Sequence, residues 1–250
     1  MDNDYIYDNY WFNSGTPFYL VKLIETNNYS IIDFNSNSIE KGRSELLAPY
    51  SVKDLDLPIL LYQSGYLSIT NKETLEGSIY FTLDFPNISV RSSFYDILCS
   101  FISTKMVSET KKSIIKALNK ADFKLLEDTI KILFASIPHQ YNPVMGDISR
   151  ITDYEGYYSS ILFAYLKATT AFIEGEISTN HGRLDLYVKT ANNHYIFEFK
   201  ATETGALAQI EDRKYYEKYL DDTKRDLCLV GINFDVEDKN ISKLKYKKLN

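Results

Sequence analysis

Hydrophobic and polar positions follow two different patterns along this chain. In the first part, apolar residues recur every three or four positions, which is the period of an amphipathic helix. In the second part, short apolar and alternating runs prevail, as they do in strands. The stretch PHQYNPVMG at residues 138–146 is rich in residues that break regular structure and separates the two parts. We therefore predict one domain at residues 1–140 and a second at residues 141–250.

The first domain is predicted to be an α+β region, mostly helical, with one small β-hairpin. A helix at 57–63 ends before Gly65, a residue suited to a helix C-terminus. Strands at 66–69 and 78–83 follow it, and this order resembles part of a winged helix. Further helices are predicted from their apolar spacing and capping residues at 16–27, from Asn87 to 101, at 107–119 and at 122–137.

The second domain is predicted to have the element order α-β-β-β-α-β-β. Its last strand alternates apolar residues with lysine, which is typical of a strand at a sheet edge. His194 is placed in the turn that leads into the third strand. The predicted helices span 153–170 and 205–220, and the predicted strands span 172–179, 183–189, 195–200, 227–234 and 241–249.

Charge and composition limit the function classes. The 250 residues carry 28 basic and 34 acidic side chains, a net charge of −6, so bulk charge does not favour nucleic-acid binding. Cys99 and Cys228 form no metal-binding pair and lie in apolar sequence, as buried free thiols do. The first residues lack a signal-peptide pattern, and the longest apolar run, at 57–62, is too short to span a membrane. We expect a cytoplasmic protein without membrane contact.

Candidate chemistry is concentrated in GRLDLYVKTANNHYIFEFK, residues 182–200. Side chains alternate between the two faces of a strand, so Glu198 and Lys200 share one face. If the two strands pair as a hairpin, Asp185 lies beside Glu198. Two neighbouring carboxylates repel each other unless a cation lies between them, and their oxygens suit Mg²⁺ or Mn²⁺. A plain Glu–Lys pair on a half-exposed strand is the simpler alternative.

The preceding helix offers a third carboxylate. Glu155 has the helical spacing of Tyr158 and Leu162, on the face expected to pack against the sheet. A carboxylate directed toward a core is costly unless it is paired or binds a metal. Glu155 is therefore a candidate third metal ligand.

These residues and their order resemble the D…ExK signature of the PD-(D/E)XK nuclease superfamily. The resemblance implies a restriction-endonuclease-like α/β domain with an αβββαβ core and a mixed sheet. The chain is also similar, over most of its length, to the C-terminal nuclease portion of bacterial AAA-ATPase-like proteins. It has no G-x-x-x-x-G-K-[ST] motif, so ATP-driven activity is not expected. We expect either a short version of such proteins or a piece of a longer one.

The resemblance also implies roles for individual residues. Asp185, Glu198 and the Phe199 carbonyl would bind the metal, Lys200 would activate the attacking water, and Glu155 would complete the site. Gln209 would contact metal or substrate. The tyrosine in some relatives follows the glutamine by four residues, whereas Tyr215 and Tyr216 follow it by six and seven here. The expected substrate-binding residues are Arg183, Gln209, Tyr215, Tyr216 and His181, although a surface loop is an alternative for His181.

The sequence thus predicts an Mg²⁺- or Mn²⁺-dependent nuclease that hydrolyses phosphodiester bonds, in DNA rather than RNA. The alternative is a protein-interaction module built on a retained or inactive nuclease fold. A homodimer and a protein partner for the first domain are both compatible with the sequence. The basic residues Lys243, Lys245, Lys247 and Lys248 have two readings, namely contact with a nucleic-acid backbone or a solvated edge strand.

Overall fold

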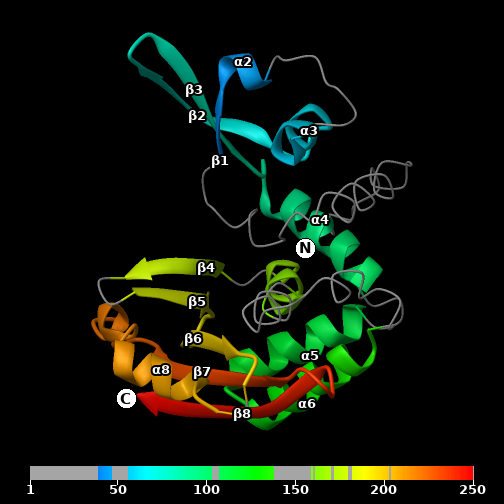
Figure 1. Cartoon of the computed structure of the whole chain (residues 1–250), viewed down its shortest axis with the longest axis vertical. Coiled ribbons are helices and arrows are strands. Elements are labelled where there is room, and N and C mark those ends of the chain that lie inside the picture. Colours follow the sequence, from blue (N-terminus) through cyan, green and yellow to red (C-terminus); the bar gives the residue numbers. More distant parts are fainter. Residues whose placement is uncertain are drawn as a thin grey trace, which may run out of the picture. The chain divides into compact units, whose positions relative to one another are not determined.

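The computed structural model of the chain describes residues 39–46, 56–102, 107–137, 159, 161–169, 172–179, 182–202 and 204–249. The chain divides into two compact units, Met1–Ile97 and Leu98–Asn250. Figure 1 labels the helices and strands of both units. No helix within the described ranges has the length and apolar character needed to cross a membrane.

The first unit contains a small antiparallel sheet with strand order β1-β3-β2. The strands are β1 (Ile39–Gly42), β2 (Ser68–Leu75) and β3 (Ser78–Asp84), and the helices before the hairpin are α2 (Arg43–Leu46) and α3 (Leu57–Gln63). The predicted helix at 57–63 and a hairpin after it are present, but the first strand of the hairpin spans Ser68–Leu75 rather than the predicted 66–69. The winged-helix-like interpretation stays a prediction, and the helix predicted at 16–27 lies outside the described residues.

Local sequence explains how α3 begins and ends and how α4 begins. Pro58 occupies the first turn of α3, where a missing N–H costs nothing, and Gly65 adopts φ +83° just after the helix. Helix α4 (Ile88–Ile102) begins at Asn87, whose side-chain oxygen accepts a hydrogen bond from the Val90 N–H at 2.9 Å. The start of α3 thus follows its proline, and the start of α4 follows the Asn87 cap.

The second unit is built on a five-stranded sheet with order β4-β5-β6-β7-β8. Strands β6 and β7 pair in parallel and the other neighbours pair antiparallel, so the sheet is mixed as predicted. The chain enters the sheet after a helix at 161–167, and helix α8 connects β6 to β7. The bounds are β4 (Phe172–Thr179), β5 (Gly182–Lys189), β6 (Asn193–Lys200), α8 (Ala206–Arg213), β7 (Asp226–Asp235) and β8 (Asn240–Leu249).

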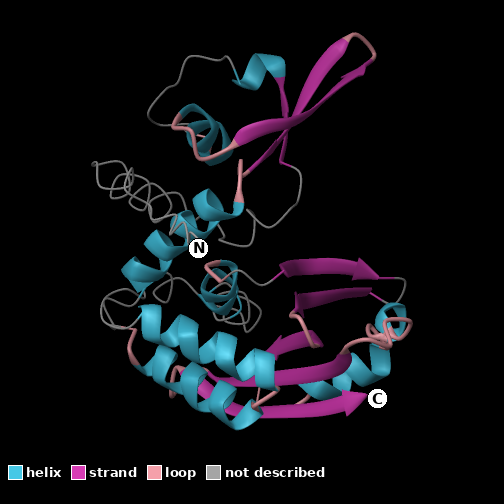
Figure 2. Ribbon diagram, turned by 180° about the vertical axis from the view of Figure 1, so that it is seen from behind, coloured by secondary structure: helices cyan, strands magenta, loops and turns pink. Residues whose placement is uncertain are grey.

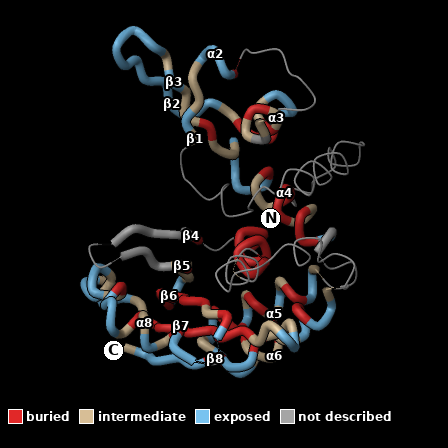
Figure 3. Tube along the Cα trace, viewed as in Figure 1, coloured by how far each residue is buried: buried red, intermediate tan, exposed pale blue. Residues whose placement is uncertain are grey.

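The central strands of this sheet are covered on both faces. Helices α5 (Val107–Lys120) and α6 (Phe123–Ala135) pack on one face, while α8 packs on the other (Figures 1 and 2). Strand β6 is therefore buried along nearly its whole length, whereas the edge strand β8 is mostly exposed (Figure 3). A strand that is buried on both sides reads as a continuous apolar run, which is the pattern of β7.

The division between the units differs from the boundary predicted near residue 140. The structure assigns α5 and α6 to the second unit, where α6 packs on β8 and α5 packs on α6. The hydroxyl of Tyr195 and the side-chain amide of Asn193 both donate to the Leu118 carbonyl at the end of α5. The ring of Phe123 stacks on Tyr246 of β8 with 3.7 Å between centroids.

The helix after β6 is shorter than predicted. Helix α8 ends at Arg213, since Lys214 adopts a left-handed conformation with φ 52°, and a short 3-10 helix follows at Glu217–Tyr219. The prediction of one helix over 205–220 is therefore wrong at its C-terminal end. Because the helix ends at this point, Tyr215 and Tyr216 do not continue the helical spacing from Gln209.

Candidate active site

Strands β5 and β6 bring the predicted acidic residues to neighbouring positions. The antiparallel register pairs Leu186 with Phe197, and the ladder recorded between the two strands ends there. Asp185 and Glu198 are the next residues beyond this last pair. The hairpin geometry that the sequence analysis required for these two carboxylates is thus present.

Asp185 binds the backbone of the strand that carries the other site residues. Its carboxylate accepts a hydrogen bond from the Phe199 N–H at 2.9 Å. Beyond the last paired residues of β5 and β6, the Asp185 side chain replaces a backbone carbonyl as the acceptor. The carboxylate is therefore fixed at the end of the paired region. A carboxylate held by a backbone N–H keeps a fixed position, which favours a role as a ligand.

Glu198 lies at the centre of the arrangement. Its side chain is 1% exposed, and its Oε1 atom lies 3.6 Å from the ammonium nitrogen of Lys200, which is 25% exposed. The same oxygen accepts a hydrogen bond from the side-chain amide of Gln209 on α8. A buried carboxylate requires compensating charge and hydrogen bonds, and these two side chains supply both.

Gly231 explains why α8 lies close enough to the sheet for Gln209 to reach Glu198. The parallel register places Gly231 beside Glu198. A Cβ atom on Gly231 would lie 2.2 Å from the Leu207 nitrogen and 2.7 Å from its Cα atom, far inside van der Waals contact. Only a glycine at this position lets the first turn of α8 rest directly on β7.

Asn233 holds the connection between the site and α8. It lies beside Lys200 in the register, is 2% exposed, and donates from its side-chain amide to the Thr202 carbonyl at 2.9 Å. This contact fixes the chain just after Lys200. Gly231 and Asn233 were not predicted as site residues, although a lone glycine within the apolar run of β7 was a usable signal.

The structure does not bring all the predicted site residues together. Tyr215 is 3% exposed and belongs to a hydrophobic cluster with Ile196 and Ile210, and Tyr216 packs against that cluster. Both tyrosines thus contact the apolar core beneath α8, where the break at Lys214 carries them. Glu155 and His181 lie outside the described residues, as does the side chain of Arg183.

His194 lies in strand β6, not in the predicted turn before it. It is 3% exposed, its Nδ1 atom lies 2.6 Å from the Tyr187 hydroxyl, and its Nε2 atom lies 2.8 Å from Asp222. Arg225 also binds Asp222, at 2.7 Å. The hydrogen bond from His194 and then that from Arg225 hold the pKa of Asp222 well below its usual range. This network lies at the amino end of β6, away from Glu198.

The donor set fits a hard divalent cation. Two carboxylates on adjacent strands, the Phe199 carbonyl between Glu198 and Lys200, and the Gln209 side chain all offer oxygen atoms. Within the described ranges, no three His, Cys, Asp or Glu side chains form a metal-binding group. Among the described residues, the carboxylates at the site are therefore the two of the predicted motif, Asp185 and Glu198.

Comparisons with known proteins agree with this arrangement. Residues 153–244 match the family model of the PD-(D/E)XK nuclease superfamily. The matched segment contains Asp185, Glu198, Lys200 and Gln209. The resemblance that the motif predicted is confirmed for this segment, and the superfamily to which it points is one of nucleases.

A protein of Azotobacter chroococcum mcd 1, described as an uncharacterized protein in the vnfD 5′ region, is similar over most of the chain. The two are 29% identical over 243 residues, which cover 93% of this chain and 45% of that protein. The chain therefore spans less than half the length of this relative. No solved structure matches the chain.

Proposed function

We propose that this chain is a metal-dependent nuclease that hydrolyses phosphodiester bonds in nucleic acid. The observation that carries the proposal is the meeting of Asp185, Glu198 and Lys200 at the end of the β5–β6 ladder. The family match at residues 153–244 supports the same activity.

Each side chain of the site has a chemical task in this proposal. Asp185 and Glu198 hold the cation together with the Phe199 carbonyl. When bound, Mg²⁺ or Mn²⁺ lowers the pKa of a water molecule and polarises the phosphoryl oxygens. Lys200 is partly exposed and lies beside Glu198, so its ammonium group can orient the attacking water and stabilise negative charge on the phosphate. Gln209 holds Glu198 in place through its hydrogen bond.

Cleavage assays test this assignment. Wild type is compared with Asp185→Ala and Lys200→Ala on labelled DNA in the presence of Mg²⁺ or Mn²⁺. Each substitution removes a ligand or a charge that acts at the reacting phosphate, so the rate should fall by at least about 100-fold. Asp212→Ala and Lys224→Ala are matched controls, since both side chains are exposed and neither belongs to the site. The controls should cleave as wild type does.

Equal residual cleavage in all variants would reject the assigned site. If the wild type neither cleaves DNA or RNA nor binds divalent cations by calorimetry, the nuclease proposal fails. That result would favour the alternative, a protein-interaction module built on an inactive nuclease fold.

The finer parts of the proposal follow from the resemblance. We take DNA as the preferred substrate, Mg²⁺ as the resident cation, and the cytoplasm as the location. Cleavage of DNA and RNA strands of the same sequence tests the first point directly. A homodimer and a protein partner for the first unit are further proposals, which light scattering of the purified protein and affinity capture with the full chain would test.

A further inference from the structure

Three lysines share one face of the edge strand β8. Lys243, Lys245 and Lys247 occupy alternate positions, and alternate side chains of a strand point to the same side of the sheet. The register pairs them with Asn233, Gly231 and Leu229 of β7, in that order. Paired residues on adjacent strands share a face.

The register of the next strand identifies that face. Asn233 and Gly231 pair in turn with Lys200 and Glu198 of β6. The two rows Lys200–Asn233–Lys243 and Glu198–Gly231–Lys245 therefore cross the sheet on one side. The lysines of β8 lie on the same face as the candidate active site.

Side-chain contacts support this assignment of faces. Lys247 forms a 2.6 Å ion pair with Glu211 of α8, the helix that carries Gln209. On the opposite face, Tyr246 stacks on Phe123 of α6, and the ammonium group of Lys248 lies 5.7 Å from the same ring. The intervening residues of β8 thus pack on the helix layer, while the three lysines point the other way.

The two lysines of β8 nearest the candidate active site can bind an anionic ligand. Lys243 and Lys245 are exposed, and neither forms an ion pair with any residue in the described ranges. Two strand spacings separate β8 from β6, about 10 Å. The first turn of α8 lies on Gly231 of β7, between the two strands. A nucleic-acid backbone that runs from the site to these lysines would therefore pass around the start of α8.

We propose that Lys243 and Lys245 form a phosphate-binding row, which holds the sugar–phosphate backbone of a DNA substrate beside the active site. This inference rests on the proposed nuclease function. It explains how a chain with a net charge of −6 would bind a polyanion, because two exposed basic side chains lie on the sheet face that carries Glu198 and Lys200. Protection of an exposed strand edge is the competing explanation for these lysines.

Salt-dependent binding tests the row without relying on cleavage. The probe is a fluorescent DNA duplex, and its affinity is measured by anisotropy between about 50 and 200 mM salt without divalent cations. The test variant is Lys243→Gln/Lys245→Gln. The control is Lys112→Gln/Lys116→Gln, which removes two exposed lysines from α5 on the other face of the sheet and changes the net charge equally.

The test variant should bind more weakly, and its slope of log affinity against log salt should be smaller by about 1.8, which is about 0.9 for each lost phosphate contact. The control should keep the wild-type slope. The proposed row is rejected if the test variant keeps the wild-type slope, or if the slope of the control falls by the same amount. It is also rejected if the wild type does not bind DNA.

Hydrolysis of a small phosphodiester distinguishes failure of the lysine row from failure of the proposed nuclease function. Bis(p-nitrophenyl) phosphate has no backbone that could reach β8, so the test variant should hydrolyse it at the wild-type rate. Slower hydrolysis of this compound by the test variant would contradict a role confined to binding. Absence of hydrolysis by the wild type would count against the active site, while the salt slopes would still decide the row.

Discussion

At the scale of single residues, the environment of Glu198 determines what the site can do. Its carboxylate is almost fully buried, and its Oε1 atom is approached by both the Lys200 ammonium group and the Gln209 side-chain amide. The alternating pattern of FEFK was sufficient to predict the pairing with Lys200. The resemblance implied only that Gln209 contacts metal or substrate. Its hydrogen bond to Glu198 was not predicted, because no local pattern reports which helix residue will reach a strand.

Replacement of Gln209 by alanine should lower activity without unfolding the protein. Loss of the amide releases Glu198, and the loss of a residue that orients a ligand typically costs about 10- to 100-fold in metal affinity or activity. Calorimetric titration with Mn²⁺ and steady-state cleavage measure both effects. Gln63→Ala, on an exposed side chain of the first unit, is the control and should change neither. Wild-type Mn²⁺ affinity in Gln209→Ala would show that the amide does not position the carboxylate.

The two thiols are predicted to be unreactive in the folded protein. Cys99 and Cys228 are fully buried, and burial raises the pKa of Cys228 to about 11. A thiol that is buried and protonated reacts slowly with disulfide reagents. Reaction with dithionitrobenzoate at neutral pH should be negligible until guanidinium chloride unfolds the chain. Rapid labelling of a thiol in native buffer would contradict the burial of these residues.

At the scale of elements, the strands of the second unit were predicted closely, whereas the end of α8 and the packing partners of the helices were not. Strands β5, β6 and β7 begin and end within two residues of their predicted bounds because their alternating and apolar runs are local signals. The end of α8 was missed because Lys214 is neither glycine nor proline and carries no sign of its left-handed conformation. The orientation of Tyr215 and Tyr216 was missed with it.

Gly231→Ala should separate α8 from the sheet. The added methyl group would overlap the Leu207 backbone, so the helix must move away, and Gln209 with it. We expect a loss of about 1–3 kcal/mol in stability, measured by urea unfolding, and weaker Mn²⁺ binding at temperatures where the variant stays folded. Gly42→Ala is the control, since its new Cβ would meet only ordinary contacts at 3.8 Å. Unchanged stability and Mn²⁺ binding in Gly231→Ala would refute the close approach.

The His194 network should make stability depend on pH in the acid range. The bonds from His194 and Arg225 lower the pKa of Asp222 in the folded state. A lowered pKa stabilises the fold above the ordinary aspartate pKa of about 3.9, and this contribution is lost as the pH falls further. The unfolding free energy of wild type should therefore decrease more steeply below about pH 4 than that of Asp222→Asn.

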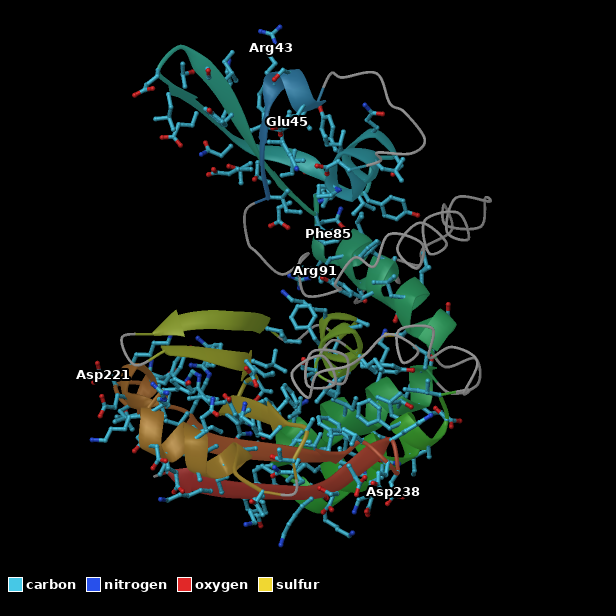
Figure 4. The ribbon with its side chains drawn as sticks, viewed as in Figure 1. Arg43, Glu45, Phe85, Arg91, Asp221 and Asp238 are labelled. Atoms are coloured by element: carbon cyan, nitrogen blue, oxygen red, sulfur yellow. The ribbon has the colours of Figure 1, made fainter. Side chains whose placement is uncertain are left out.

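The matched control for this prediction is the exposed neighbour Asp221. Figure 4 labels Asp221 and Asp238, which lie at opposite ends of the sheet of the second unit. Asp221→Asn should keep the wild-type pH profile. Parallel acid profiles for wild type and Asp222→Asn would show that the network does not contribute to folding.

At the scale of the whole molecule, the division into two units could not be predicted from helix patterns. The apolar stripes of α5 and α6 look the same whether these helices pack on each other, on the first unit or on a sheet. Contacts with residues far along the chain show that these helices pack on the sheet of the second unit, namely those with Asn193, Tyr195 and Tyr246. Contacts between residues more than 70 positions apart leave no local trace in a sequence.

Divalent cations should raise the midpoint of thermal unfolding. A ligand that binds only the folded state stabilises it by about 2.7 kcal/mol at 100 times its dissociation constant, which corresponds to a rise of about 5–10 °C for a protein of this size. Differential scanning fluorimetry with and without Mn²⁺ measures the rise. The double variant Asp185→Asn/Glu198→Gln should lose it, while Asp212→Asn should retain it. A rise of equal size in the double variant would place the cation elsewhere.

The carbonyl of Leu118 joins the helix layer to the middle of the sheet. It accepts hydrogen bonds from Asn193 and Tyr195, both buried, so a fragment starting at residue 141 would leave two interior donors without their acceptor. Helix α5 and strand β6 must consequently open together. In a hydrogen–deuterium exchange experiment their amides would form one slowly exchanging group, and the smallest fragment able to refold would begin before α5.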